Sequence, residues 1–325
     1  MVLDNGEKVQ YDKLLVATGS KPFVPPMKGL DEVEDRFTFM TWDSAKAIRE
    51  KVTAGTKVLI IGAGLIGLKC AEALHHLNAD ITVVDLADRI LPSILDIRAG
   101  EIMQKHIEDK GTKFILGTSV EQFSKNSAKL TNGDTVDFDI LVVAVGVRPN
   151  TELVSDAGGK VEKGIITDLH QQTTLDNVYA AGDCTVSHDC SSNTDRILAL
   201  LPNAFMQGEV AGKNMAGEET LYLNAIPMNA IGFYGLHIIT AGSYDGDEDI
   251  TEDADKEIYK KLVFKDGLLK GFILMGDVAR AGIYTSMIKE QIPLTEVDLD
   301  LLREKPQMMM FGKARREEKL AGKKH

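Results

Sequence analysis

Three glycines in the sequence have the spacing that binds the phosphates of a dinucleotide. The segment from residue 57 to 85 reads KVLIIGAGLIGLKCAEALHHLNADITVVD and contains Gly-x-Gly-x-x-Gly. In such a loop the first glycine permits a tight turn, the second lets the backbone approach a pyrophosphate, and the third lets a helix pack closely. The helix N-terminus then offers N–H groups and a positive dipole end to the phosphates. We therefore predict a dinucleotide site at Gly62, Ala63, Gly64, Leu65, Ile66 and Gly67.

An acidic residue indicates which dinucleotide binds. Asp85 closes the second apolar segment, 23 residues after Gly62. This is near the spacing of about 20 at which a carboxylate binds the ribose hydroxyls. The carboxylate would repel a 2′-phosphate, and Arg89 alone is a weak phosphate clamp. We therefore predict that the segment binds a dinucleotide and does not serve helix packing alone. We also predict that this dinucleotide is NADH rather than NADPH.

A repeated segment indicates two related halves. Residues 3–22 (LDNGEKVQYDKLLVATGSKP) and 130–149 (LTNGDTVDFDILVVAVGVRP) align without a gap at an offset of 127, and ten of the twenty positions are identical. Each copy has an Asn-Gly pair, for which we expect a two-residue turn, and then an apolar strand that ends at glycine. Only the second copy is preceded by a glycine loop. We expect the first copy to end a dinucleotide half whose start is missing, by truncation, in a shortened gene, or because another polypeptide carries it.

These segments resemble the FAD-dependent pyridine nucleotide–disulfide oxidoreductase superfamily. The matching pieces are YDKLLVATGSKP, VLIIGAGLIGLKCAEAL, DILVVAVGVRPNTEL and NVYAAGDC, in the family's order, over roughly residues 3–217. They look most like the NADH-dependent reductases allied to NADH oxidase, rubredoxin reductase and the FAD domain of nitrite reductase. A later segment, GFILMGDVARAGIYTSMIKEQIPL, is similar to their C-terminal interface domain. The resemblance implies FAD and NAD as cofactors.

The resemblance also implies further cofactor-binding residues. They lie in ATGS, in the strand end of the second copy, and in AGDC, and they are Thr18, Gly19, Ser20, Val145, Gly146, Gly182 and Asp183. Asp183 could accept a hydrogen bond from a flavin hydroxyl, or it could simply cap a helix. Leu65 and Lys69 stand where relatives often carry Tyr and Glu, so Lys69 lies either near the nicotinamide or on a solvated helix face.

No catalytic residue follows from the sequence. The family's redox cysteines are not matched by Cys70, Cys184 or Cys190, although a dithiol of the last two is conceivable. His188 with Cys184 and Cys190 lacks the fourth ligand of a usual zinc site, so we predict no metal. The few scattered cysteines indicate a reducing, cytoplasmic compartment.

Bulk properties exclude two classes of partner. The net charge of -12 disfavours nucleic acid, whose phosphates need a basic surface. No apolar run of 18 residues is present, so we predict no membrane partner.

The expected fold class is α/β, with a Rossmann-like NAD domain inserted in an incomplete FAD domain and a C-terminal α+β interface domain. The predicted boundaries are 1–43 for the end of the first FAD half, 44–148 for the NAD domain, 149–217 for the second FAD half, and 218–325 for the interface domain and tail. We expect Asp43 to cap the helix that leads into the NAD domain. The apolar strands of the interface domain predict a homodimer.

Two functions remain open. The first is an FAD-dependent NADH oxidoreductase that passes hydride to flavin and electrons to an unidentified acceptor. The second is a truncated or assembly subunit that binds NAD(H) without a competent flavin site. A yellow colour of the purified chain would separate them.

Overall fold

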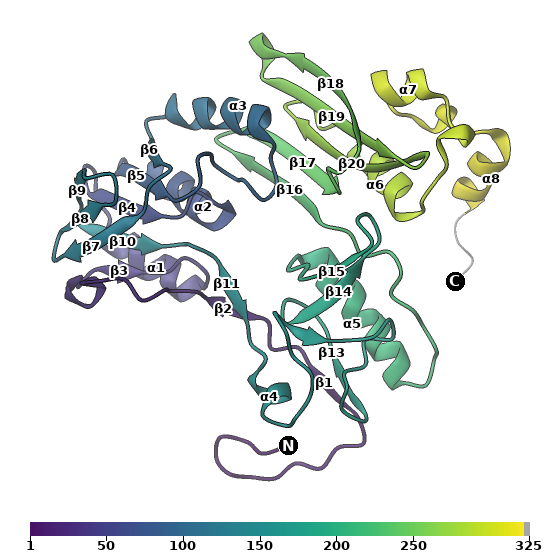
Figure 1. Cartoon of the computed structure of the whole chain (residues 1–325), viewed down its shortest axis with the longest axis horizontal. Helices are drawn as coiled ribbons and strands as arrows, with labels where there is room; N and C mark the ends of the chain where they lie inside the picture. The colour runs from purple at the N-terminus through teal and green to yellow at the C-terminus, as the bar shows by residue number, and fades with distance from the viewer. Residues whose placement is uncertain (322–325) are drawn as a thin grey trace. The chain divides into compact units, whose positions relative to one another are not determined.

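The computed structural model describes residues 1–321, and they form two compact units (Figure 1). The central unit comprises Lys21–Arg148 and Ile231–His237. The flanking unit comprises Met1–Ser20, Pro149–Ala230 and the described residues from Ile238 onward. The chain thus enters the central unit from the first part of the flanking unit and later returns to it.

The central unit is built on a five-stranded parallel sheet. Its strand order is β3 (Arg36–Phe37), β10 (Ile140–Val143), β4 (Lys57–Ile61), β5 (Asp80–Asp85) and β6 (Lys113–Leu116). The accompanying helices are α1 (Trp42–Lys51), α2 (Leu65–His75) and α3 (Ile97–Glu108). All four residues of β10 are buried, as expected for a strand of a parallel sheet covered on both faces.

A short antiparallel meander completes the central unit. It consists of β7 (Val120–Ser124), β8 (Ser127–Leu130) and β9 (Thr135–Asp137). Phe123 packs against Phe138 with a ring-centroid distance of 6.2 Å, and both rings are buried with the apolar side chains of β4 and β10. The meander therefore shares its core with the parallel sheet.

The prediction that Asp43 caps α1 is wrong. The N-cap is Thr41, whose hydroxyl accepts a hydrogen bond of 3.1 Å from the Ser44 amide. The Ser44 hydroxyl in turn accepts from the Thr41 amide at 3.1 Å. This reciprocal pair satisfies two N–H groups, and Asp43 lies inside the first turn.

The Asn-Gly turns are not the predicted two-residue turns. Only Gly133 has a positive φ, 96°, and Asn132 does not. Leu130 donates to the Asp134 carbonyl at 2.8 Å, which leaves a three-residue loop between them. The first copy forms the equivalent bonds around Gly6, whose φ is 83°. A glycine in the left-handed region is typical of three-residue hairpin loops.

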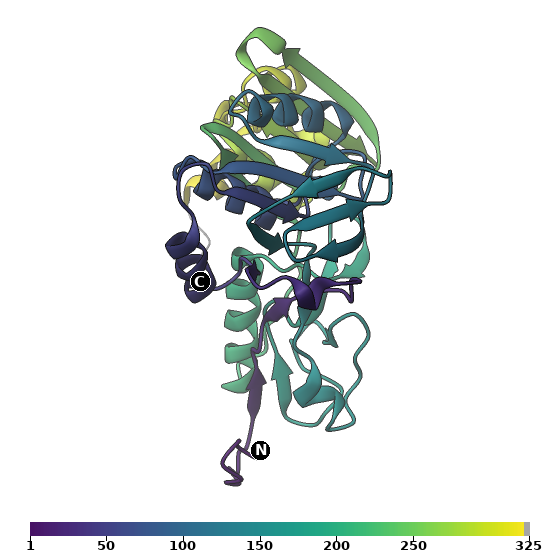
Figure 2. The ribbon, with the colours of Figure 1, turned by 90° about the vertical axis from the view of Figure 1, so that its left-hand side faces the viewer.

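The flanking unit contains a small parallel pair of strands. β1 (Leu14–Val16) pairs with β13 (Val178–Ala180), and Figures 1 and 2 show this purple strand beside the teal strands and helix α5 (Leu201–Met215). The other elements of this part of the unit are α4 (Glu152–Ser155), β12 (Ile165–Ile166), β14 (Thr185–Asp189) and β15 (Thr194–Arg196). Strands β2 (Ser20–Pro22) and β11 (Val147–Pro149) pair with each other, and each contains residues of both units.

The C-terminal part of the chain forms an antiparallel sheet. Its order is β16 (Met228–Phe233), β17 (Leu236–Gly242), β20 (Leu268–Met275), β19 (Ile258–Lys265) and β18 (Asp247–Asp253). The helices are α6 (Ala281–Lys289), α7 (Leu299–Glu304) and α8 (Lys313–Ala321). Residues Leu294–Glu296 form a single 3-10 turn, and α7 begins at Leu299.

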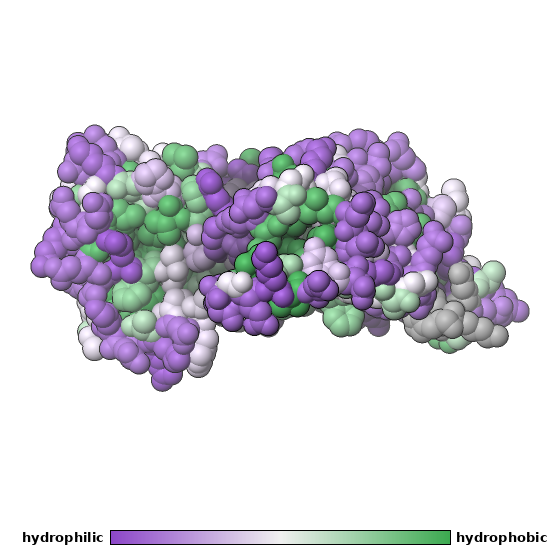
Figure 3. All heavy atoms as spheres, turned by 90° about the horizontal axis from the view of Figure 1, so that it is seen from below, coloured by the Kyte–Doolittle hydropathy of each residue, from purple (hydrophilic) through white to green (hydrophobic). Residues whose placement is uncertain are grey.

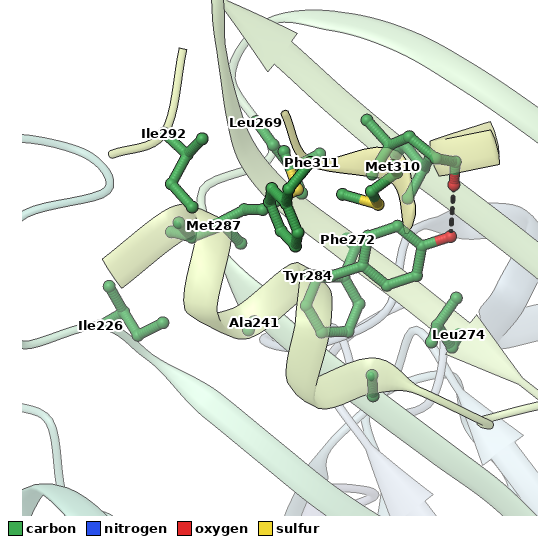
Figure 4. Packing of buried hydrophobic residues seen from close by; sticks show 14 of the residues in the cluster. Ile226, Ala241, Leu269, Phe272, Leu274, Tyr284, Met287, Ile292, Met310 and Phe311 are labelled. Atoms are coloured by element: carbon green, nitrogen blue, oxygen red, sulfur yellow. Dashed lines mark hydrogen bonds between the residues drawn. The ribbon is translucent and has the colours of Figure 1, made fainter. Parts of the chain in front are cut away.

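An aromatic cluster holds α6 on this sheet (Figure 4). The Phe272 and Tyr284 rings lie 5.4 Å apart, and the Tyr284 hydroxyl donates to the Leu302 carbonyl at 2.8 Å. This bond satisfies a buried hydroxyl and links α6 to α7.

Figure 3 shows mainly hydrophilic side chains on the face seen from below, with apolar patches between them. Within residues 1–321, no helix has the length and apolar character to cross a bilayer.

Candidate functional site

The glycine loop of the central unit has the geometry of a phosphate-binding turn. A Cβ on Gly62 would lie 2.4 Å from the Ala144 carbonyl oxygen, and one on Gly67 would lie 1.9 Å from the Gly62 oxygen. Both positions therefore require glycine for close packing. A Cβ on Gly64 would have no atom within 4 Å, so this glycine borders open space where a ligand can approach. The three glycines thus take the separate roles that their spacing predicts.

Helix α2 begins immediately after this open glycine. Gly64 is the N-cap, and no side chain caps the helix. The first N–H groups of a helix have no acceptor within the helix, so a negatively charged group at this position is stabilised. Leu65 and Ile66, the first residues of α2, are half-buried. This end of the helix can therefore hold a pyrophosphate by backbone groups alone.

Asp85 lies next to the loop, as the sequence predicted. One carboxylate oxygen accepts a hydrogen bond of 2.6 Å from the Ala63 amide, and the other accepts one of 2.7 Å from the Ala87 amide. These bonds fix the carboxylate at the end of β5 and leave further lone pairs for ribose hydroxyls. The side chain is half-buried.

The end of β10 lies on the other side of the loop. The Ala144 amide donates to the Ile61 carbonyl at 2.8 Å, which places Val145 and Gly146 beside the end of β4. Val145 is exposed, and Gly146 has a φ of 122° with open space around it. In a parallel sheet of this kind a dinucleotide lies across the carboxyl ends of the strands. The structure thus brings together all of the predicted residues of the central unit.

The predicted residues of the flanking unit also meet. The Ser20 hydroxyl and the Asp183 carboxylate are 3.4 Å apart, and Gly19 has a φ of 63° with open space for an added Cβ. Asn150 holds this turn, because its side chain donates to the Thr18 carbonyl at 2.9 Å and its amide donates to the Gly19 carbonyl at 2.9 Å. The role of Asn150 was not predicted, although it follows the Arg-Pro of the second copy.

Asp183 is not a helix cap. It follows Gly182, whose φ is 85°, and the next element is strand β14 rather than a helix. The N-cap of α5 is Leu200, well beyond this turn. With the alternative removed, the half-buried carboxylate of Asp183 is available to accept a hydroxyl hydrogen bond.

Two buried amides of α5, one of which supports this turn, were missed by the sequence reasoning. Gln207 is 1% exposed, and its carbonyl accepts a hydrogen bond of 2.6 Å from the Gly182 amide while its NH2 group donates to Ser187. Asn203 is fully buried and donates to the Ile226 carbonyl at 2.9 Å. Both lie on α5. Their polarity at buried positions of that helix was the only signal.

Lys69 is partly exposed and has fixed partners. Its ammonium is 2.5 Å from the Glu72 carboxylate and 2.7 Å from the Gly232 carbonyl oxygen, and it lies 5.2 Å from the centroid of the Phe233 ring. The side chain is thus partly exposed to solvent, as one of the two alternatives expected, and it is also bound by neighbouring residues. Lys69 is a fixed cation on α2.

The cysteines are structural in this conformation. Cys70, Cys184 and Cys190 are all buried free thiols, and no disulfide joins any two of them. Burial raises the pKa of Cys70 to about 12. Within residues 1–321, no cluster of three or more His, Cys, Asp or Glu side chains could hold a metal ion.

Comparisons with known families agree with this geometry. Residues 1–208 match the family described as pyridine nucleotide-disulphide oxidoreductase. Residues 227–292 match the rubredoxin NAD+ reductase C-terminal domain. The predicted fold class is thereby confirmed, with parallel sheets of the FAD/NAD type and a C-terminal domain built on an antiparallel sheet.

Several curated proteins are similar over most of the chain. The epsilon subunit of NADH-dependent phenylglyoxylate dehydrogenase from Aromatoleum evansii is 33% identical over 90% of the chain and 72% of its own length. The assimilatory nitrate reductase electron transfer subunit from Bacillus subtilis is 31% identical over 90% of the chain. An NADH oxidase from Methanocaldococcus jannaschii is 37% identical over 67% of the chain. The chain spans only 38% and 50% of the last two proteins.

Solved structures show the same fold. A NAD-dependent persulfide reductase from A. fulgidus superposes with a TM-score of 0.81 at 27% identity, over 91% of this chain and 60% of that one. Putidaredoxin reductase, in its covalent complex with putidaredoxin, gives a TM-score of 0.85 at 22% identity over 94% of this chain and 75% of that one.

The family matched by residues 1–208 binds FAD and NAD(H), and it includes NADH-dependent flavoprotein oxidoreductases. Its match covers residues 1–208, and the A. evansii relative is matched over most of both chains. The glycine loop, Asp85 and the paired turns of the flanking unit lie inside the matched region. The chain belongs to the pyridine nucleotide-disulphide oxidoreductase family.

Proposed function

We propose that the chain is an FAD-dependent NADH oxidoreductase that passes electrons to a separate acceptor. The observation that carries the proposal is the glycine loop, in which Gly64 is open while Gly62 and Gly67 are closely packed. An unobstructed helix N-terminus next to a carboxylate on β5 is what an NADH molecule needs for its pyrophosphate and its ribose. The same carboxylate would repel the 2′-phosphate of NADPH.

The flanking unit contains groups that fit part of a flavin nucleotide. Gly19 and Gly182 both have a positive φ, and their backbone can approach a ligand that a side chain would obstruct. Asp183 offers a carboxylate to a ribityl or ribose hydroxyl, and Ser20 orients it. Thr18 is fixed by its bonds to Asn150. We infer that Thr18, Gly19, Ser20, Gly182 and Asp183 would contact FAD.

The chain would bind and orient the two nucleotides, and bound FAD would supply the hydride and electron chemistry. Asp85 would select the ribose, the α2 N-terminus would hold the pyrophosphate, and the backbone of Val145 and Gly146 would border the other end of the dinucleotide. No acidic or basic side chain is needed as a proton carrier in this proposal. The acceptor fits a redox protein or a further subunit, because several relatives are named as electron transfer or dehydrogenase subunits.

The test is anaerobic titration of the FAD-loaded chain with NADH. We expect flavin absorbance to bleach on addition of NADH and to bleach more slowly with NADPH. Calorimetry with NADH alone serves as the parallel measurement. NADH binding without bleaching of bound flavin would contradict the proposal, as would no binding of NADH at all.

A second candidate is a subunit that binds NAD(H) but lacks a competent flavin site by itself. It is favoured by one edge of the flanking unit, where β1 pairs with β13 alone among the described strands. Leu201 and Phe205 on the neighbouring helix α5 are 87% and 74% exposed. We infer that a further strand–loop–helix segment, from more of the same chain or from a separate polypeptide, would cover this edge and bring the flavin phosphate site.

We also propose that the C-terminal sheet supports a homodimer. Exposed apolar surface on an α+β domain is usually covered by association, most often with two-fold symmetry. Light scattering on the whole chain would test this. A monomer at micromolar concentration, unaffected by deletion of the residues after about 217, would refute it.

A further inference from the structure

The tip of the β16–β17 hairpin, Ile231–His237, packs in the central unit, although its two strands continue in the antiparallel sheet. Its turn residues are Tyr234 and Gly235, with φ values of 50° and 91°. Asn or Asp is normally favoured at the first of these positions, because a bulky residue is strained in the left-handed region. Such strain persists only where surrounding contacts impose it, and it occurs often at clamps and switches.

The contacts that impose it come from α2 and its neighbours. The Tyr234 amide donates to the Glu72 carboxylate at 2.6 Å, and its ring meets the His75 ring edge-on at 5.2 Å. Its hydroxyl lies 3.3 Å from that of Thr112, and its carbonyl oxygen lies 3.3 Å from Nε2 of His106 on α3. Tyr234 therefore binds the central unit with its amide, carbonyl, ring and hydroxyl.

The residues before the turn hold the same helix. Gly232 accepts the hydrogen bond from Lys69, and Phe233, which is fully buried, lies under the Lys69 ammonium. Lys69 and Glu72 pair with each other as well as with the hairpin. Two residues of α2, one turn apart, are thus tied to three consecutive residues of the tip.

Helix α2 is consequently held on two sides. Gly67 lets it rest directly on the glycine loop, and the tip holds it through Lys69 and Glu72. Lys69 is only four residues, about one turn, from Leu65, where the phosphate-binding end starts. Backbone donors bind a pyrophosphate well only when their direction is fixed, so a tether this near the N-terminus would affect affinity.

We infer that the hairpin tip positions the N-terminus of α2 for the dinucleotide pyrophosphate, with Lys69, Glu72 and Tyr234 as positioning residues. The inference rests on the proposed NADH site and adds to it a segment distant in sequence. Lys69 acts here through the helix and does not touch the nicotinamide. This has a consequence that can be measured with ADP-ribose, which has the pyrophosphate but no nicotinamide.

The main variant is Tyr234→Asn, which suits the turn but removes the ring and hydroxyl contacts. The matched control is Asp266→Asn in the Asp266–Gly267 turn of the β19–β20 hairpin, where both φ values are also positive at 54° and 71°. We expect Tyr234→Asn to weaken NADH binding by calorimetry about tenfold, or about 1.4 kcal/mol, and Asp266→Asn to leave it unchanged. Circular dichroism of the whole chain verifies that both variants fold.

Lys69 supplies the second arm. Lys69→Met should lower the affinities for NADH and for ADP-ribose by the same factor. Lys69→Arg, which can still donate to Gly232, should restore most of the affinity. If Lys69→Met lowers the affinity for NADH but not for ADP-ribose, the cation acts on the nicotinamide and the inference is overturned. It is equally overturned if Tyr234→Asn folds and binds NADH within twofold of the parent. Failure of the parent chain to bind NADH would instead refute the proposed function.

Discussion

The two copies of the repeated segment have the same local structure and different neighbours. Both turns form the same pair of backbone hydrogen bonds around a left-handed glycine, at Gly6 and Gly133. Each strand is then followed, three residues after its end, by a glycine with a positive φ, Gly19 or Gly146. Yet β10 lies between β3 and β4 with all its residues buried, whereas β1 pairs only with β13 among the described strands and only Val16 is fully buried.

The difference suggests what kind of segment would fit the open edge of β1. Beside β10 the neighbour is β4, which leads directly into the glycine loop and α2. If the copies are related as their sequences indicate, the open edge of β1 suits a parallel strand followed by the same kind of loop and helix. An uncovered strand edge of this kind tends to pair with another chain.

The largest expected effect concerns FAD. We expect the 325-residue chain by itself to bind FAD about a thousandfold more weakly than the same chain supplied with a polypeptide that carries a strand, a Gly-x-Gly-x-x-Gly turn and a helix. Each charge-assisted hydrogen bond to a phosphate contributes roughly 1.5–3 kcal/mol, and about two such bonds suffice for this factor. Fluorescence quenching of FAD on titration measures both affinities.

The control for this experiment is the same added polypeptide with its glycines replaced by valine, which should have no effect. Stoichiometric FAD in the purified chain without any addition would contradict the expectation. The open edge of β1 would then have no part in flavin binding, and the comparison of the two copies would lose its functional meaning.

Substitutions at two glycines of the loop before α2 should have different effects, one on stability and the other on NADH binding. Gly67→Ala places a Cβ 1.9 Å from the Gly62 oxygen, which is backbone and cannot yield easily. We expect a loss of about 3 kcal/mol in the free energy of unfolding of the central unit, by denaturant titration. Gly64→Ala meets nothing and has a φ of -84°, so it should fold normally and yet bind NADH more weakly. Equal stability of the two variants would refute the packing argument.

The sequence was sufficient for these local features because they depend on neighbours in the chain. Gly62, Gly64, Gly67 and Asp85 lie within one strand–helix–strand segment, and their roles follow from the spacing. The α1 cap was mispredicted for a related reason: Thr41 and Asp43 are both good caps, and the Ser44 hydroxyl that returns the bond favours Thr41.

The sequence was insufficient where the partner is distant. Gln207 and Gly182 are 25 residues apart, and Tyr234 is 162 residues from Glu72. Nothing in the local pattern predicts that a hairpin tip would bind α2 and give Lys69 a distant partner in Gly232. Such contacts depend on tertiary packing, which periodicity and spacing do not encode.

The next effect, in size, concerns coenzyme choice. Asp85→Ser should weaken NADH binding by about 10- to 100-fold, because a hydrogen bond to a charged group contributes roughly 1.5–3 kcal/mol. The substitution should weaken NADPH binding less, since the repulsion of the 2′-phosphate is also removed. Asp85→Asn, which can still accept one of the two amide bonds, is the control for the loop geometry. Tighter binding of NADPH than NADH by the parent chain would contradict the role of Asp85.

The smallest effect uses thiols to compare the two copies directly. Cys184 lies under β1, with its sulfur 3.3 Å from the Ala181 carbonyl oxygen and 3.7 Å from that of Val16. Cys70 lies inside α2, which belongs to the second copy's unit, and both thiols are fully buried. A strand with one open edge should detach more often than a helix packed on a five-stranded sheet, so reagent should reach Cys184 first.

Burial raises the pKa of Cys70 to about 12, which disfavours its reactive thiolate in the folded chain. In single-cysteine variants with Cys190 also replaced, we expect an aromatic disulfide reagent to label Cys184 at least about tenfold faster than Cys70. The added strand–loop–helix polypeptide should lower the labelling rate of Cys184 and leave the labelling rate of Cys70 unchanged. Equal labelling rates, or a rate for Cys184 that the polypeptide does not alter, would mean that β1 is as firmly held as β10.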